Sequence, residues 1–366
     1  MNGEPIETAL KLAKASADLT SPNPRVGCVL QNEWGHQLGQ GHTQRAGGPH
    51  AEVMALRDAA AKGNDVVGAT AYVTLEPCSH LGRTGPCCDA LIAAGIRKVV
   101  ASIADPNPLV AGQGFARLRA AGVEVTVGPG AAESRELNIG FFSRMIRGTP
   151  WVRMKVAASL DGTTALENGQ SQWITGEAAR TDGHAWRARA CAVLTGIGTV
   201  LQDNPRLDVR LVETPRQPHL VIVDSRMEIP LDAALFEPAR AVFIYTALND
   251  DAKRSALESK GATVVFMPDA NHKVDLAAMV RDLGQREINE LHVEAGSKLN
   301  GSLISAGLVD EYLLYLAPML LGPGPGLAAL APLSELRQSV KLAFKSMQMV
   351  GQDLRLIARG AGRDKF

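Results

Sequence analysis

The chain has 366 residues, which is long for a single domain and favours two. Lysine and arginine number 38, as do aspartate and glutamate, and 4% of residues are aromatic, which argues against the basic, aromatic-rich surface typical of nucleic-acid-binding proteins. No apolar stretch has the length of a signal peptide or membrane span, and five cysteines are an odd number for a disulfide framework. We therefore expect a cytoplasmic protein with no membrane or nucleic-acid partner.

The first part of the chain alternates between helical and strand patterns. Apolar residues recur at helical spacing over 5–19, and the turn at 21–24, which contains two prolines, ends this helix. We predict further helices at 51–61, 88–94 and 115–121, strands at 26–31, 70–75, 97–103 and 123–127, and a loop at 39–48. This alternation predicts a three-layer α/β/α domain that ends near residue 146.

A metal site is predicted where three soft ligands meet. His50 lies at the start of a predicted helix, Cys78 follows a predicted strand, and Cys87 opens another helix. One imidazole and two thiolates suit a tetrahedral zinc ion and leave the fourth position to water, as in catalytic zinc sites. Zinc lowers the pKa of that water, and Glu52 is close enough to take up its proton without being a ligand. His-x-Glu followed by Pro-Cys and a second Cys is the pattern of zinc deaminases, in which hydroxide attacks a ring carbon that bears an exocyclic amine.

The second thiolate ligand is open on this evidence. The gap between Cys78 and Cys87 is 87 − 78 − 1 = 8 residues rather than two, so a loop precedes Cys87. Cys88 is an alternative to Cys87, and His80 is an alternative to either. A structural zinc site would leave Glu52 without a role, and four such residues in this context argue against a chance grouping.

These motifs resemble the deaminase half of the bifunctional deaminase–reductase family of riboflavin biosynthesis. The resemblance rests on His50-Ala51-Glu52, Glu76-Pro77-Cys78-Ser79-His80, Gly82-Arg83-Thr84, Cys87 and Asp105-Pro106-Asn107-Pro108. It implies a cytidine-deaminase-like fold, one Zn2+ per chain, and hydrolytic removal of the 2-amino group of a diaminopyrimidinone that carries a ribosylamino 5-phosphate. It also implies substrate contacts from Asn23, His42, His80 and Arg83, although the residue pattern alone gives Asn23 an Asx turn equally well. Ser21 and Gly85 depart from the histidine and proline usual in the family, which concerns the substrate loops rather than the metal site.

A joint between two domains is predicted at 148–150, where a glycine and a proline separate two periodic segments. We place the zinc-dependent pyrimidine deaminase domain at 1–146 and a reductase domain at 147–366. In the second domain we predict strands at 151–157, 190–195, 219–224, 241–246, 263–266, 291–294 and 313–316, helices at 176–189, 251–260, 274–286 and 300–306, two strands within 342–358, and a frayed tail at 359–366. This is a second α/β domain.

The second domain carries weaker chemical signals. It has no G-x-G-x-x-G after a strand, so a Rossmann site is not supported. Residues 294–301 instead enter a helix through two glycines, which suits a phosphate or forms an ordinary turn. Arg206 and Arg210 bracket a short segment and either clamp a phosphate or remain solvated. Trp173 suits a binding site or the core.

Several motifs resemble the reductase half of the same family, which is related to dihydrofolate reductase. They are 155–162, 171–175, 198–200, 203–207 and 293–296, so that the resemblance spans roughly residues 5–358. It implies a dihydrofolate-reductase-like α/β fold, NADPH as hydride donor, reduction of the ribosyl group to ribityl, and a homodimer or higher homo-oligomer. The implied NADPH site consists of Ala157, Trp173, Thr199, Asp203, Ser225, Gly296, Ser297, Lys298, Leu299, Asn300, Gly301 and Ser302. The implied substrate site consists of Ser171, Arg187, Arg206, Arg210 and Glu294, and Lys155 and Asp203 are candidates for handling the proton that accompanies hydride transfer.

We therefore predict a bifunctional enzyme that first deaminates a phosphoribosyl pyrimidine and then reduces its ribosyl group. The alternative is a deaminase of another nucleotide or of a nucleic-acid base, with a second domain that is no reductase. The neutral charge and low aromatic content argue against a nucleic-acid base. A third hypothesis is a non-catalytic zinc module that binds a partner protein, and Glu52 beside an open coordination position argues against it.

Overall fold

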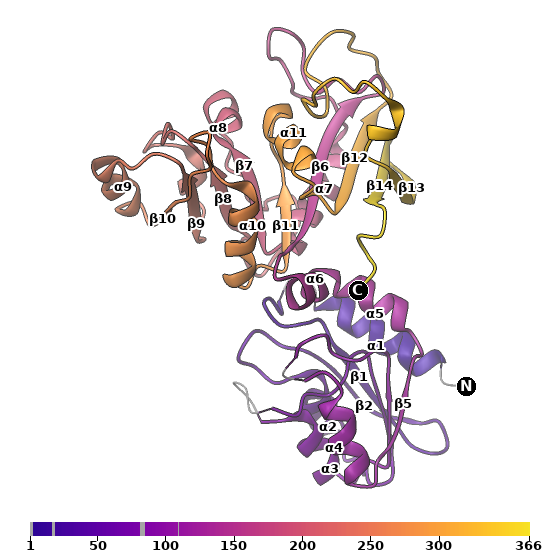
Figure 1. The fold of residues 1–366 in the computed structure, drawn as a ribbon. Coiled ribbons are helices and arrows are strands. Elements are labelled where there is room, and N and C mark those ends of the chain that lie inside the picture. The colour runs from indigo at the N-terminus through magenta and orange to yellow at the C-terminus, as the bar shows by residue number, and fades with distance from the viewer. Residues whose placement is uncertain (1–2, 17–18, 81–84, 109) are drawn as a thin grey trace. The chain divides into compact units, whose positions relative to one another are not determined.

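A computed structural model describes residues 3–16, 19–80, 85–108 and 110–366 (Figure 1). The chain divides into two compact units, Met1–Arg147 and Gly148–Phe366. None of the helices in these described segments is long and apolar enough to cross a membrane. Each unit combines one sheet with flanking helices, which confirms the predicted α/β class.

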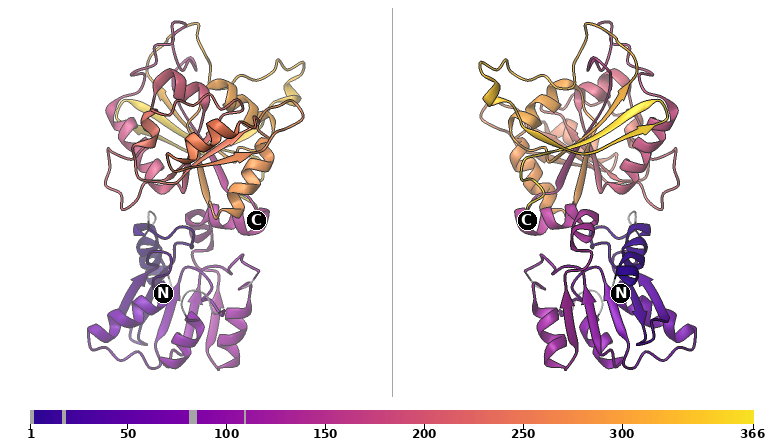
Figure 2. Two further views of the ribbon diagram at one scale, coloured as in Figure 1. Left: turned by 90° about the vertical axis from the view of Figure 1, so that its left-hand side faces the viewer. Right: turned by 90° about the vertical axis from the view of Figure 1, so that its right-hand side faces the viewer.

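The first unit is a five-stranded sheet with helices on both faces. Its elements are α1 (Gly3–Ala15), β1 (Gly27–Gln31), β2 (Gln37–His42), α2 (Ala51–Ala61), β3 (Thr70–Val73), α3 (Cys87–Ala93), β4 (Lys98–Ala101), α4 (Gln113–Ala120), β5 (Glu124–Val127), α5 (Ala131–Leu137) and α6 (Ile139–Arg147). The strand order is β2-β1-β3-β4-β5, with β1 antiparallel to both neighbours and β3, β4 and β5 parallel. α1 and α5 lie on one face, and α2, α3 and α4 lie on the other (Figures 1 and 2). The predicted three layers are therefore confirmed.

The loop predicted at 39–48 is wrong in its first part, because the segment up to His42 belongs to β2. Gly39 and Gly41 weaken the strand pattern in the sequence, since glycine has no side chain to pack. Because neither glycine has a side chain, α2 can lie directly on the strand. A Cβ atom on Gly39 would lie 2.4 Å from the Ala55 carbonyl oxygen, and one on Gly41 would lie 2.5 Å from the Ala55 nitrogen. This close packing fixes the start of α2.

The helices α5 and α6 were not predicted, and α1 ends at Ala15 rather than at residue 19. Side chains of α5 and of the residue that follows it are held by distant backbone. Asn138 accepts a hydrogen bond from the Arg25 N–H at 2.7 Å and donates one to the Arg25 carbonyl at 2.9 Å, and the Ser134 hydroxyl donates to the Thr74 carbonyl. The partners are 113 and 60 residues apart in the sequence, so no local pattern predicts these contacts.

The second unit is a nine-stranded sheet. Its elements are β6 (Trp151–Ser159), α7 (Glu177–Arg189), β7 (Ala192–Gly196), α8 (Ile197–Asp203), β8 (His219–Val223), η1 (Ala234–Phe236), β9 (Val242–Thr246), α9 (Asp251–Glu258), β10 (Ala262–Phe266), α10 (Leu276–Gln285), β11 (Glu290–Val293), α11 (Ser297–Ser305), β12 (Glu311–Ala317), η2 (Leu336–Gln338), β13 (Leu342–Val350) and β14 (Asp353–Gly360). The strand order is β10-β9-β8-β7-β11-β6-β12-β14-β13. Neighbours from β10 to β12 are parallel, and β14 is antiparallel to β12 and β13.

The two faces of β6 differ in chemistry. Val152 and Met154 point into the main hydrophobic core, which α10 and α11 complete. Arg153 points to the opposite face, under α7, where its guanidinium forms buried ion pairs with Glu290 and Glu311. The charged face continues along β6 to Lys155, which lies level with the end of β11.

The prediction of a frayed tail at 359–366 is wrong for the first and the last residue of this segment. Arg359 lies in β14, and its Nη2 is 2.7 Å from Glu311 Oε2. The ring of Phe366 packs against that of Trp151, with centroids 6.3 Å apart. Partners so distant in sequence give no periodic signal.

Candidate functional site

Three side chains of the first unit converge at one end of its sheet. His50 is the N-cap residue of α2, Cys78 lies in the loop after β3, and Cys87 is the first residue of α3. His50 Nδ1 is 3.6 Å from Cys78 Sγ and 3.3 Å from Cys87 Sγ, and the ligand atoms of the three residues all lie within 4.8 Å of one another. No other described trio of His, Cys, Asp or Glu comes this close. One nitrogen and two sulfurs at these separations fit a zinc ion with one position to spare.

The two thiols differ in how readily they ionise. The hydrogen bond with the Cys87 thiol lowers the pKa of Cys78 to about 4, and His50 and the Cys87 backbone N–H, 3.3 Å from Cys78 Sγ, act in the same direction against burial. That same hydrogen bond and burial raise the pKa of Cys87. Because a metal ion binds thiolates, its binding must displace any proton that the two thiols hold.

Glu52 lies in the first turn of α2 and is buried. Burial and the charge of the Cys78 thiolate raise the pKa of Glu52, and the charge of His50 only partly offsets this. The carboxylate therefore accepts a proton more readily than an exposed glutamate does. This is the property required of a group that takes up a proton and returns it within one reaction.

The alternative ligands lie outside the cluster. The Cys88 thiol donates to the Pro77 carbonyl at 3.2 Å and to the Gly114 carbonyl at 3.5 Å, and burial raises the pKa of Cys88 to about 12. His80 Nδ1 is buried and has no hydrogen-bond partner in the part of the chain that the structure describes. The geometry favours Cys87 as the second thiolate.

We expect the Cys88→Ala variant to retain one zinc ion per chain, because in the unaltered protein the Cys88 thiol is protonated and donates to backbone carbonyls rather than to the cluster. Cys87→Ala is the matched control, and its loss of a thiolate at the cluster should lower the bound zinc well below one per chain. Elemental analysis of the purified variants measures this directly. Zinc loss in Cys88→Ala with retention in Cys87→Ala would reverse the ligand assignment.

Glu76, which the sequence analysis named as part of a motif but gave no role, organises the loop beside the cluster. Its carboxylate accepts hydrogen bonds from four backbone N–H groups, those of Asp105 at 3.2 Å, Gly112 at 2.9 Å, Gly114 at 2.9 Å and Phe115 at 3.2 Å. It thereby ties Asp105 and the 112–115 segment to the loop after β3. The available signal was an acidic residue at a strand end, just before a ligand.

The remaining residues expected to bind the pyrimidine are dispersed over loops and strand ends. Asn23 lies in the turn after α1, where its N–H donates to the Thr20 carbonyl at 2.8 Å. His42 ends β2, and its Nδ1 is 3.2 Å from Gln44 Nε2. Arg83 lies outside the described residues.

In the second unit, two cationic side chains from different elements meet at Glu294. Glu294 directly follows β11 and forms two parallel hydrogen bonds with the Arg187 guanidinium of α7, one of them 2.9 Å long. Lys155 Nζ lies 3.7 Å from Glu294 Oε2. Burial raises the pKa of Glu294, but the charges of Arg187 and Lys155 outweigh it and hold this pKa well below its usual value. Burial lowers the pKa of Lys155, and Arg187 adds to this while Glu294 opposes it.

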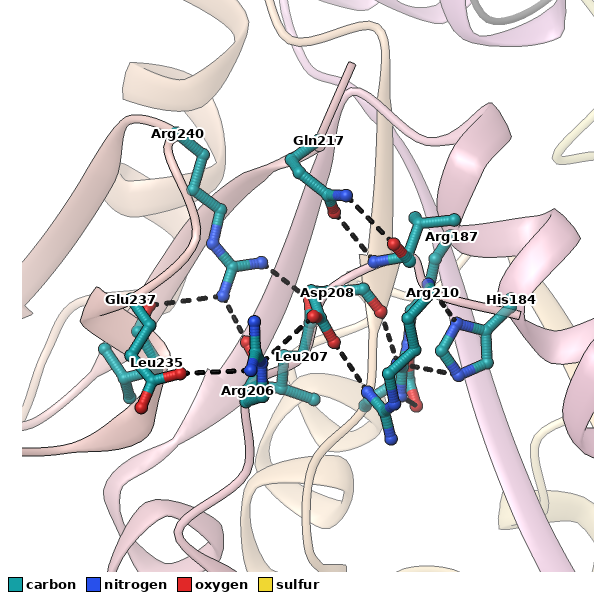
Figure 3. Close-up of polar contacts among 12 residues, drawn as sticks. His184, Arg187, Arg206, Leu207, Asp208, Arg210, Gln217, Leu235, Glu237 and Arg240 are labelled. Carbon is teal, nitrogen blue, oxygen red and sulfur yellow. Dashed lines mark hydrogen bonds and ion pairs between the residues drawn. The ribbon is translucent and has the colours of Figure 1, made fainter. Parts of the chain in front are cut away.

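An arginine-rich segment adjoins this group (Figure 3). The buried Asp208 carboxylate lies between Arg206, with Nε 3.1 Å from Oδ2, and Arg210, with Nη1 2.6 Å from Oδ1. The Asp208 carbonyl accepts a hydrogen bond from Arg187 Nη1 at 2.9 Å, which links the segment to Glu294. Sequence reasoning identified the arginines but missed Asp208, for which the alternation of opposite charges at every second residue was the signal.

Several candidates for cofactor binding lie near the starts of two helices, α8 and α11, which follow the neighbouring parallel strands β7 and β11. Gly296 is the N-cap residue of α11, and a Cβ on it would lie 3.8 Å from the Thr199 hydroxyl of α8. Asn300 Nδ2 donates to the Leu327 carbonyl at 3.0 Å, whereas its buried Oδ1 has no hydrogen-bond partner among the described residues. Helix starts and an orphaned amide oxygen fit a polar, anionic cofactor.

Several of the other residues expected to bind cofactor have structural partners. A Cβ on Gly301 would lie 2.1 Å from the Ala329 carbonyl oxygen, so close packing explains this glycine. The Ser225 hydroxyl accepts a hydrogen bond from the Val274 N–H at 3.1 Å. Leu299 packs against the main core.

Two further candidates also have a structural partner within α11: the Ser302 hydroxyl donates a hydrogen bond to the Lys298 carbonyl at 3.1 Å. Ser297 is the first residue of this helix. Asp203 ends α8, and burial raises its pKa. Ala157 lies on β6.

The loop between β6 and α7 carries Ser171 and Trp173. The Trp173 ring is 63% exposed and is covered on one face by the Arg180 guanidinium, 4.6 Å from the ring centroid. Trp173 is thus not a core residue, which leaves it available to a ligand.

Two family models match the chain. The cytidine and deoxycytidylate deaminase zinc-binding region matches residues 3–103, and the RibD C-terminal domain matches residues 150–356. The riboflavin biosynthesis protein RibD of Escherichia coli is 44% identical over 367 residues, which cover 96% of this chain and 98% of the relative. The RibD protein of Aquifex aeolicus is 40% identical over 349 residues, covering 95% and 96%.

Solved structures agree with these matches. RibD of Acinetobacter baumannii superposes with a TM-score of 0.89 at 38% identity, covering 98% of this chain and 99% of that one. A diaminohydroxyphosphoribosylaminopyrimidine deaminase/5-amino-6-(5-phosphoribosylamino)uracil reductase from Thermotoga maritima superposes with a TM-score of 0.86 at 32% identity, with the same coverage. Both neighbours span the two units.

Proposed function

Because this chain belongs to the RibD family, and is therefore a bifunctional deaminase and reductase of riboflavin biosynthesis, we propose which of its residues carry out each reaction. The first unit carries the zinc-binding deaminase and the second the reductase. The substrate of the first reaction is the diaminopyrimidinone ribotide, the compound after which the Thermotoga maritima deaminase is named. The clustering of His50, Cys78 and Cys87 beside the buried Glu52 is the observation that carries the deaminase assignment.

In the deaminase reaction, His50, Cys78 and Cys87 hold zinc. When bound, the metal would supply Lewis acidity that lowers the pKa of a water molecule at the open position. Glu52 would take up a proton from that water as the water oxygen bonds to the ring carbon, and would return it to the exocyclic amine as the carbon–nitrogen bond breaks and ammonia leaves. Asn23, His42, His80 and Arg83 orient the pyrimidine and its phosphate.

In the reductase reaction, the starts of α8 and α11 would hold NADPH, which would supply a hydride when bound. Thr199, Gly296 and Asn300 line this site, with Trp173 at its exposed side. Arg187 and Glu294 hold the ribosyl group beside Lys155, which delivers the accompanying proton because burial has lowered its pKa. Asp203 is the second candidate for this proton.

Arg206 and Arg210 bind the substrate phosphate. Their side chains are about half exposed, with fractions of 49% and 50%, so both can reach a ligand. Paired arginines suit the planar, multidentate recognition of a phosphate better than lysines do.

A coupled assay tests the division of labour. Purified protein given the diaminopyrimidinone ribotide without NADPH should release ammonia and accumulate the deaminated ribotide. Oxidation of NADPH should require that deaminated product. NADPH oxidation with the undeaminated substrate alone, or no ammonia release from zinc-loaded protein, would contradict the proposal.

We also propose that the protein is a homodimer that pairs through β13. Within the described segments this strand ends the sheet order and pairs with β14 alone, so its other edge offers backbone groups that no strand pairs (Figure 1). Leu342, Phe344, Met347 and Met349 on it are 44–67% exposed. A long apolar edge of this kind marks an association surface, and a second copy of the same strand is its natural occupant.

Phe344→Glu combined with Met347→Glu should convert the dimer to a monomer of 38.8 kDa, because two like charges would face their own copies across the interface. Sedimentation velocity measures the mass. Val67→Glu, an equally exposed apolar position in the first unit, is the control and should leave the mass unchanged. A monomeric unmodified protein, or a dimer that persists in the double variant, would rule out this interface.

The five free cysteines include two proposed metal ligands, which fits the reducing cytoplasm. Fractionation of cells that produce the protein would test this location.

A further inference from the structure

We propose that Asp208 is a positioning residue of the reductase, which fixes Arg206 and Arg210 for the substrate phosphate; this rests on the function proposed above. Its carboxylate is 7% exposed, whereas the two guanidinium side chains on either side of it are half exposed (Figure 3). The buried anion therefore lies beneath the cations and leaves their outer surfaces to a ligand.

The contacts divide one carboxylate between two arginines. Asp208 Oδ1 accepts a hydrogen bond from Nη1 of Arg210, and Oδ2 accepts one from Nε of Arg206. Nη1 of Arg206 is 3.1 Å from Glu237 Oε2. Among the described residues, Nε and Nη2 of Arg210 and Nη2 of Arg206 bond to no other side chain, so these donors remain for a phosphate.

The Asp208 carboxyl group is ionised at the pH at which the enzyme works, because its surroundings lower its pKa. Burial raises the pKa of Asp208, but the hydrogen bond and charge of Arg210, together with the charge of Arg206, outweigh burial and hold this pKa below its usual value. The trio carries two positive charges and one negative charge. Without the carboxylate, two guanidinium groups at this separation would repel each other and lose their fixed directions.

The backbone that carries Asp208 is also held in place. Arg240 Nη1 donates to the Leu207 carbonyl at 2.6 Å, and the Gln217 amide makes two hydrogen bonds with the backbone of Val209, of 2.7 and 2.9 Å. The Arg210 N–H donates to His184 Nδ1 at 3.2 Å. With its main chain anchored at successive residues, the segment cannot shift to compensate for a lost side-chain contact.

The sign of the effect of Asp208→Asn on substrate binding separates positioning from simple charge. Removal of the carboxylate charge makes the site more positive, so electrostatic attraction alone would lower the KM for a phosphorylated substrate. Loss of positioning would raise it. Glu237→Gln adds the same charge beside Arg206 while leaving Asp208 intact, and it serves as the charge-matched control.

The experiment measures NADPH oxidation with the deaminated ribotide and with its dephosphorylated form. We expect Asp208→Asn to raise the KM for the ribotide about tenfold or more, with kcat within about threefold and the KM for NADPH unchanged. The KM for the dephosphorylated form should not change. Glu237→Gln should lower the ribotide KM or leave it within about twofold. An unchanged or lower ribotide KM in Asp208→Asn overturns the inference.

A second variant tests the inference even if Asp208→Asn folds poorly. Asp208→Glu keeps the charge but displaces the carboxylate by one methylene, so it should raise the ribotide KM about threefold or more if position matters, and an unchanged KM overturns the inference. Arg210→Ala tests the underlying assignment. An unchanged ribotide KM in Arg210→Ala refutes the phosphate site itself, whereas a raised KM there with no effect in the Asp208 variants refutes only the role of Asp208.

Discussion

Replacement of Glu52 by glutamine is expected to reduce ammonia release by a factor of about 100 to 10,000 while zinc remains bound. Glutamine has the shape of glutamate but cannot take up a proton from water. The ligands His50, Cys78 and Cys87 are unchanged, so the loss should appear in kcat rather than in metal content. Glu52 is buried, which leaves no bulk water beside it to replace the missing base.

The measurement pairs elemental zinc analysis with ammonia release from the diaminopyrimidinone ribotide. Reduction of the separately supplied deaminated ribotide with NADPH is the internal control, because it uses the second unit and should retain its rate. Ammonia release within about tenfold of the unaltered protein would show that another group carries the proton.

Most strands and helices could be predicted from the sequence because their patterns are local. The alternation of β6 between apolar and charged residues survives in the structure as two faces of different chemistry. The strand β2 and the helices α5 and α6 were missed for the opposite reason. Gly39 and Gly41 are suited to a strand only because α2 lies against it, and Asn138 finds its partner 113 residues away.

The candidate sites divide in the same way. His50, Cys78, Cys87 and Glu52 carry chemistry in their own side chains, so residue type and order were enough to predict a metal cluster. The roles of Glu76 and Asp208 depend on what the fold brings to them, namely four backbone N–H groups and two guanidinium groups. Such supporting carboxylates become visible only once the loops are placed in space.

Replacement of Glu294 by glutamine is expected to reduce kcat/KM of the reductase by at least about 100-fold. The Glu294 carboxylate, 12% exposed, lies beside two partly buried cations, Arg187 and Lys155, and partly compensates their charge. Removing the charge of one member of such a group leaves the remaining charges without compensation. The cost is on the order of several kcal/mol, as it is when one partner of a buried ion pair is removed. Arg187 keeps its hydrogen bond to the Asp208 carbonyl, so the helix α7 should stay in place and the loss should be local.

The pH dependence supplies a test specific to this arrangement. Burial lowers the pKa of Lys155, and the charge of Glu294 raises it. Removing that charge lowers the pKa of Lys155 further, so its ammonium form is lost at a lower pH. If this ammonium delivers the proton, the rate falls as pH rises through the pKa of Lys155, and the alkaline limb of the profile moves to lower pH in Glu294→Gln. Ammonia release, which uses the first unit, should keep its profile. An alkaline limb that does not move would exclude Lys155 as the proton donor and leave Asp203 as the candidate.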